Sequence, residues 1–167
     1  MGILHRQRWC GATGLLVPLL TLASPGFLKI AGIAPSWAVL WLLPWALVDG
    51  PASGAVAGLA LGLVLDGLHL GRASEVPVLV LLGWWWGRIG RRGAPIERSF
   101  SLGLLALVGT ALLGGSLLLQ LYWQGGLPLP LAGWHTLMAQ TLITALLAPL
   151  VCSLLLLRWR QVASLRG

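Results

Sequence analysis

Charged residues are scarce in this chain of 167 residues: they make up 9% of it, whereas 57% is hydrophobic. A soluble domain typically carries about 25% charged residues, so this composition excludes an ordinary water-soluble protein. It also excludes a disordered chain, because disorder requires low hydrophobicity and high charge. At roughly 20 apolar residues per membrane-spanning helix, the length accommodates about six spans joined by short loops. The composition therefore predicts an all-α, polytopic membrane bundle that forms a single domain over residues 1–167.

Residues that support chemistry are also few. The two cysteines, Cys10 and Cys152, are spaced too far apart for a metal motif and imply no disulfide framework. The chain has no Gly-x-Ser-x-Gly, no Cys/His pair and no glycine-rich phosphate loop. An intramembrane enzyme would need a fuller constellation than Asp66 and His69 alone. We therefore expect a protein that is not an enzyme and that holds no metal or cofactor.

Six apolar runs predict the spans, at residues 11–28, 31–48, 51–70, 76–89, 100–123 and 132–157. The second run is interrupted by Pro35 and Pro44 and ends at a turn signal, Asp49-Gly50-Pro51. Ten tryptophans, many at the ends of runs, are typical of side chains that anchor helices at the membrane interface. We expect this role for the triplet at residues 84–86. Glutamines inside the runs predict hydrogen bonds between helices, at Gln120, Gln124 and Gln140.

The basic residues indicate how the chain is oriented. The net charge is +7, but the basic residues lie between apolar runs, which favours a role in membrane topology over nucleic-acid binding. Six spans with a cytoplasmic N-terminus leave only Lys29 and Arg72 outside. Both termini are then cytoplasmic, and the inside carries Arg6, Arg8, Arg88, Arg91, Arg92, Arg98, Arg158, Arg160 and Arg166.

Glycines recur every four residues along the third run, at Gly50, Gly54, Gly58 and Gly62. Residues four apart share one face of a helix, so these glycines predict a flat stripe. Glycine lets helix backbones approach closely in a membrane. The stripe has two interpretations: helix packing within the chain, or a groove for the helix of a partner protein.

Asp66 continues the same spacing, and an ionisable residue inside a span usually has a function. His69, Arg72 and Glu75 follow at steps of three residues. One interpretation is a polar cluster at the interface, in which Asp66 pairs with His69 or Arg72. The other is a polar contact that positions a partner protein or a small molecule. A metal site is not expected, because too few ligands converge.

The glycine stripe and its carboxylate carry a family resemblance. Together with the size and the six runs, residues 54–66 resemble the rod shape-determining MreD family. Gly58, Gly62, Leu63, Leu65 and Asp66 match the family's pattern Gly-x-x-x-Gly-Leu-x-Leu-Asp, and residues 140–149 look like its last span. The resemblance implies a scaffold of the cell-elongation complex, which supports cell shape and peptidoglycan synthesis in the bacterial inner membrane.

The implied direct partner is a bitopic MreC-like protein. The implied indirect partners are an MreB-like cytoskeleton, a RodA-like glycosyltransferase and a class B transpeptidase. The family's fold is similar to the membrane substrate-binding component of energy-coupling-factor vitamin transporters, which is the alternative function. Such a component needs a pocket of roughly 300 Å³ or more with several convergent polar groups. The chain has no Asn, and its outer half offers only Asp66, His69, Arg72, Glu75, Trp134 and His135.

Overall fold

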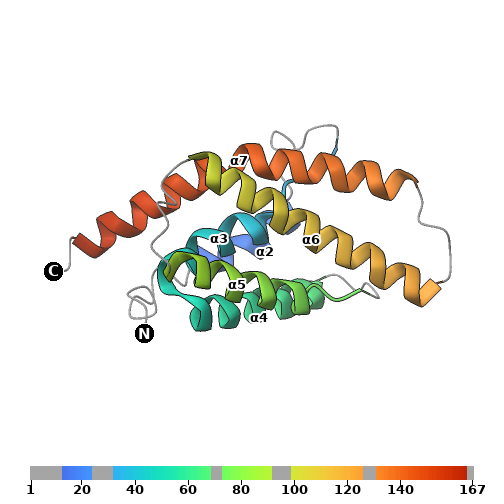
Figure 1. Ribbon diagram of the computed structural model, residues 1–167, viewed down its shortest axis with the longest axis horizontal. Coiled ribbons are helices and arrows are strands. Elements are labelled where there is room, and N and C mark those ends of the chain that lie inside the picture. The colour runs from blue at the N-terminus through green and yellow to red at the C-terminus, as the bar shows by residue number, and fades with distance from the viewer. Residues whose placement is uncertain (1–12, 24–31, 69–72, 92–98, 126–130, 165–167) are drawn as a thin grey trace.

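The computed structural model describes residues 13–23, 32–68, 73–91, 99–125 and 131–164 (Figure 1). These residues form a short 3-10 helix, η1, and six α-helices joined by short connections. The bounds are η1 Thr13–Leu15, α2 Leu16–Ala23, α3 Trp37–Asp49, α4 Pro51–Leu68, α5 Val76–Arg91, α6 Ser99–Gly125 and α7 Leu131–Ser164. The prediction of an all-α fold is confirmed for this part of the chain.

Each helix lies within or close to one of the predicted runs, but the first two helices are much shorter than their runs. Helix α2 has 8 residues and α3 has 13. Pro35 disfavours helical geometry in the residue that precedes it, Ala34, and α3 begins only at Trp37. The last two helices are longer than predicted, with 27 residues in α6 and 34 in α7.

In the part of the chain that the structure describes, three helices are long and apolar enough to cross a membrane: Pro51–Leu68 in α4, Ser101–Gly125 in α6 and Gly133–Trp159 in α7. In each of them 28% of the most apolar window is buried inside the protein, so most of its apolar surface faces outward. Water would penalise such a surface, whereas lipid would not. The described residues are therefore those of a membrane protein.

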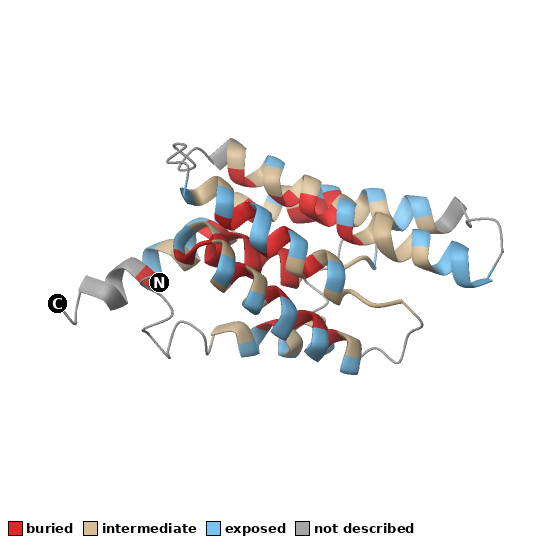
Figure 2. Cartoon of the chain, turned by 60° about the horizontal axis from the view of Figure 1, so that its bottom comes forward, coloured by how far each residue is buried: buried red, intermediate tan, exposed pale blue. Residues whose placement is uncertain are grey.

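The centre of the molecule is α3, which contacts every other α-helix (Figure 2). Ten of its residues are buried, among them Val39, Leu42 and Ala46, each at 0% exposure. A helix that is apolar on all sides lies either in a protein core or in lipid, and α3 has such a sequence and lies in the core. Pro44 lies inside it and has no N–H, so the carbonyl of Leu40 one turn earlier loses its helical donor.

Four of the other helices form two antiparallel pairs around α3, α4 with α5 and α6 with α7, while α2 packs against α3 and α4 (Figure 1). One end of the molecule holds the end of α3, the start of α4, the end of α5, the start of α6 and the end of α7 (Figure 1). The ends of α4 and α6 and the starts of α5 and α7 lie at the other (Figure 1). This alternation places the two connections that follow α4 and α6 on the same side.

Tryptophans divide between the core and the surface, which differs from the expected interfacial role. Trp41 and Trp45 stack on each other in α3 with ring centroids 5.0 Å apart, and Trp45 meets the ring of Trp159 edge-on at 5.7 Å. In the triplet, Trp86 is fully buried while Trp84 and Trp85 are exposed. The prediction is wrong for Trp86, because the ring packs over Gly109 of α6, where the absent side chain leaves space.

Candidate functional site

The glycine stripe of α4 lies against α5. A side chain at Gly54 would collide with the carbonyl of Gly83, and one at Gly58 with the carbonyl of Leu79. A Cβ at Gly62 would come within 2.7 Å of the Cα of Val76. All three are therefore buried, and the two backbones are in direct contact.

The contact continues past the start of α4, where glycines of α5 take over. Gly87 packs on Pro51 and Gly90 on Leu47, again backbone to backbone. Along α4 the contact residues advance from Gly54 to Gly62, while their partners in α5 run backward from Gly83 to Val76. The two helices therefore pack antiparallel. The stripe is thus filled by α5 of the same chain, and a partner's helix has no room on this face.

Gly50 has a different role from the other three glycines. It forms the turn between α3 and α4 with φ of 98°, a conformation that other residues rarely adopt. A Cβ at this position would approach Nε of Arg91 at 3.0 Å. The expected turn at residues 49–51 is therefore present, but Asp49 is buried there, at 4% exposure. Its burial was not predicted from the sequence.

Asp66 lies in the last turn of α4, at the end of the α4–α5 pair opposite the turn at Gly50. Its Oδ2 accepts a hydrogen bond from Oγ of Ser74 at 2.5 Å, and its Oδ1 accepts one from the backbone N–H of Glu75 at 2.8 Å. Ser74 Oγ also accepts from the N–H of Val76, the first residue of α5, at 3.3 Å. The carboxylate therefore ties the last turn of α4 to the start of α5 and satisfies donors that a helix start leaves without partners.

Gln120 connects this site to α6. Its Oε1 accepts from the N–H of Ser74 at 2.8 Å, and its Nε2 donates to the carbonyl of Ser74 at 3.0 Å. The expected hydrogen bond of Gln120 between helices is thus replaced by a two-point bond to the connection before α5. We call Asp66, Ser74 and Gln120 the polar clasp, because together they hold α4, α5 and α6 at one end.

Ser74 is the member of the clasp that the sequence did not single out. It lies one residue before the N-cap position of α5, and its Oγ accepts from the N–H of Val76 in the kind of local bond that serine forms in turns. The pairing partners expected for Asp66, His69 and Arg72, lie outside the described residues. Glu75 contributes its backbone N–H to the carboxylate.

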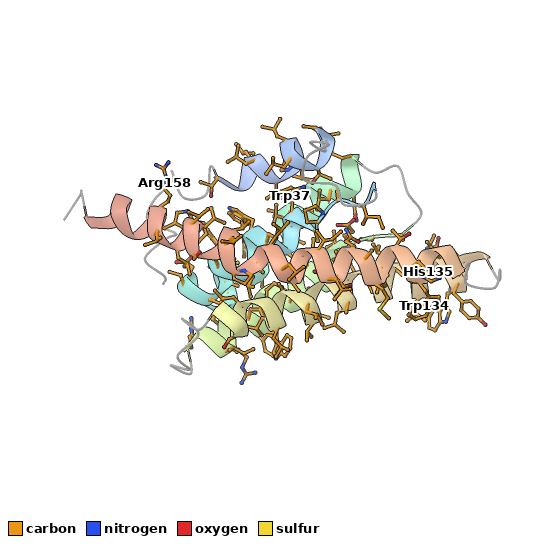
Figure 3. All side chains as sticks on the ribbon, turned by 90° about the horizontal axis from the view of Figure 1, so that it is seen from above. Trp37, Trp134, His135 and Arg158 are labelled. Atoms are coloured by element: carbon orange, nitrogen blue, oxygen red, sulfur yellow. The ribbon has the colours of Figure 1, made fainter. Side chains whose placement is uncertain are left out.

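The basic residues that the structure describes gather at the opposite end. Arg88 and Arg91 lie in the last turn of α5, and Arg158 lies toward the end of α7, far from Trp134 and His135 (Figure 3). The guanidinium of Arg88 stacks on the ring of Trp84, with Cζ 4.9 Å from the ring centroid. Other residues predicted to determine topology, or their side chains, lie outside the description: Arg6, Arg8, Arg92, Arg98 and Arg160.

Two hollows are relevant to ligand binding. A cavity of about 210 Å³ lies beside the clasp, lined by polar Thr21, Ser36, Glu75 and Gln140 together with mostly apolar side chains. A groove of about 550 Å³ lies between α5 and α6, and its lining is almost wholly apolar. In the part of the chain that the structure describes, no three His, Cys, Asp or Glu side chains are grouped as metal ligands.

Comparisons with protein families, with curated proteins and with solved structures find no match for this chain.

Proposed function

We propose that the chain is a non-enzymatic scaffold of a bacterial cell-elongation complex, in the manner of the MreD family that it resembles. It would lie in the inner membrane as six spans with both termini in the cytoplasm, and its direct partner would be a bitopic MreC-like protein. The fold would be similar to that of the membrane component of energy-coupling-factor transporters.

The observation that carries this proposal is how Asp66 is used. In the resemblance, Asp66 is the most specific residue, since it ends the pattern that begins at Gly58. Both of its oxygens accept hydrogen bonds from the connection that leads into α5. Both oxygens of this carboxylate are thus engaged in holding two helices together, which is a structural role and not a substrate-binding one. Fixed shape is what a scaffold requires.

The cavities support the same choice over the transporter alternative. A vitamin site needs roughly 300 Å³ or more with several polar groups directed into it. The hollow with polar lining has about 210 Å³, and the larger groove is apolar. Neither hollow combines the volume with the polar groups.

Co-purification tests the proposal directly. The full chain is co-expressed with the MreC-like protein of the same bacterium and extracted in mild detergent, with an unrelated bitopic protein as control. We expect the MreC-like protein to be recovered with the chain and the unrelated control protein not to be. Failure to recover it from correctly inserted chain would contradict the scaffold function. A vitamin that raises the melting temperature of the purified chain would favour the transporter alternative.

A further inference from the structure

The groove between α5 and α6 exists because these two helices diverge. Their mutual contact is far smaller than that between α4 and α5. Leu81 of α5 and Leu119 of α6 form the two sides of the groove and are 62% and 56% exposed. Gly115 lies in its lining, and a Cβ there would meet nothing within 4 Å. None of the residues that the structure describes therefore fills the groove, which opens outward.

The lining excludes a polar solute. The hydroxyl of Ser116 already donates its hydrogen to the carbonyl of Leu113 at 2.8 Å, so it has no hydrogen left to donate to an anionic or carbonyl group of a ligand. The indoles of Trp84 and Trp85 and the leucines supply apolar surface. An occupant of this groove must be apolar over most of its length.

One end of the groove has a fixed positive charge. Arg88 follows Leu81, Trp84 and Trp85 at helical spacing, so it lies on the same face of α5, one turn beyond the groove. Its side chain is exposed, and its stacking on Trp84 holds the guanidinium at this position. A guanidinium presents paired N–H donors that match the oxygens of a phosphate. The charge and the apolar groove together match an amphiphile with an anionic head.

We propose that the α5–α6 groove binds an anionic glycerophospholipid, with an acyl chain along the groove and its phosphate at Arg88. Basic residues at the membrane surface recognise anionic head groups in this way. The α6 side of the groove has the small residues on which helices pack, Ala111, Gly115 and Ser116, but a helix seated in the groove would also have to approach α5 closely. Here two tryptophans stand on the α5 side of the groove.

Native mass spectrometry of the purified full chain tests the site, with phosphatidylglycerol and phosphatidylethanolamine supplied in equal amounts. We expect phosphatidylglycerol to be retained preferentially by the native chain. Arg88→Gln should lower that preference about fivefold, which corresponds to about 1 kcal/mol for one basic residue. Arg158→Gln is the matched control, because Arg158 is exposed near the end of α7 and away from the groove lining.

A second pair of variants tests the groove itself. Gly115→Leu fills it and should lower the retention of both lipids, whereas Gly67→Leu in α4, which also enters open space, should leave retention unchanged. Leucine favours a helix more than glycine does, so neither variant should weaken its helix. Equal retention of the two lipids by the native chain, or equal effects of the two arginine variants, would overturn the proposal. So would a Gly115→Leu chain that keeps its lipid but loses the bitopic partner, since the groove would then hold a helix.

Discussion

The thiol of Cys152 in α7 donates a hydrogen bond to the carbonyl oxygen of Leu40 in α3, with a sulfur–oxygen distance of 3.7 Å. Leu40 is the residue whose helical donor is missing because Pro44 has no N–H. Both Cys152 and Leu40 are buried, at 0% and 1% exposure. A side chain of the last helix thus satisfies a backbone group that a proline leaves open in the central helix.

This relationship predicts coupling between Cys152 and Pro44. Cys152→Ala removes the donor and should lower the free energy of unfolding in detergent micelles by about 1 kcal/mol or more. In a Pro44→Ala background, the restored N–H can bond Leu40, so the same change should cost less. We expect a coupling energy of at least about 0.5 kcal/mol in the double-mutant cycle. Strictly additive effects would contradict the proposed role of the thiol.

The α4–α5 contact predicts opposite effects for two glycines of one helix. Gly58→Ala places a methyl group against the carbonyl of Leu79, and should lower the free energy of unfolding by about 1–3 kcal/mol. Gly67→Ala meets open space and should raise it by up to about 1 kcal/mol, since alanine favours a helix. Thermal unfolding of both purified variants in detergent measures the difference. Equal melting temperatures would show that the two helices do not pack this closely.

The polar clasp predicts that the shape of the Asp66 side chain matters more than its charge. Asp66→Asn keeps an oxygen that accepts from Glu75, and its amide can donate to Ser74, so we expect stability close to native. Asp66→Leu leaves both donors without an acceptor and should cost about 2–3 kcal/mol. Hydrogen exchange at residues 73–76 should accelerate in the leucine variant alone. Comparable loss in both variants would indicate that the charge itself is required.

The position of the basic residues predicts the topology of α7. The end of α7, where Arg158 lies, is at the same end of the molecule as the end of α5 with Arg88 and Arg91 (Figure 1). This end should therefore be cytoplasmic and the His135 end external. In a Cys10→Ala chain, a membrane-impermeant thiol reagent applied to intact cells should label His135→Cys. It should label Arg158→Cys only after the membrane is opened. The reverse pattern would contradict two cytoplasmic termini with six spans.

The sequence predicts where the helices lie along the chain, but not which helices pack against each other. Apolar runs and prolines locate the helices, because these depend on nearby residues. The spacing of Gly54, Gly58 and Gly62 defines a close-packing face, but it does not say that α5 occupies this face. That depends on which helix the chain brings alongside, which the spacing within one helix does not encode.

The polar sites show the same limit. Asp66 stands out because a carboxylate inside an apolar run is costly. Its partner Ser74 does not stand out, since a serine in a short connection is ordinary, and the bond of Gln120 joins residues 46 positions apart. The stacking of Trp45 on Trp41 inside α3 likewise depends on the enclosure of that helix by the other described helices.

The enclosure of α3 also sets the order in which the protein can mature. At 13 residues the helix is about 20 Å long, shorter than the roughly 30 Å hydrocarbon layer. The ribosome makes α3 before α7, yet two backbone groups at α3 have their partners in α7. The N–H of Ser36 donates to Thr144 at 3.0 Å, and the carbonyl of Leu40 accepts from Cys152. These backbone groups therefore stay without their partners until α7 has been synthesised. A chain truncated before α7 lacks these partners, so we expect membrane proteases to degrade it faster than the full chain.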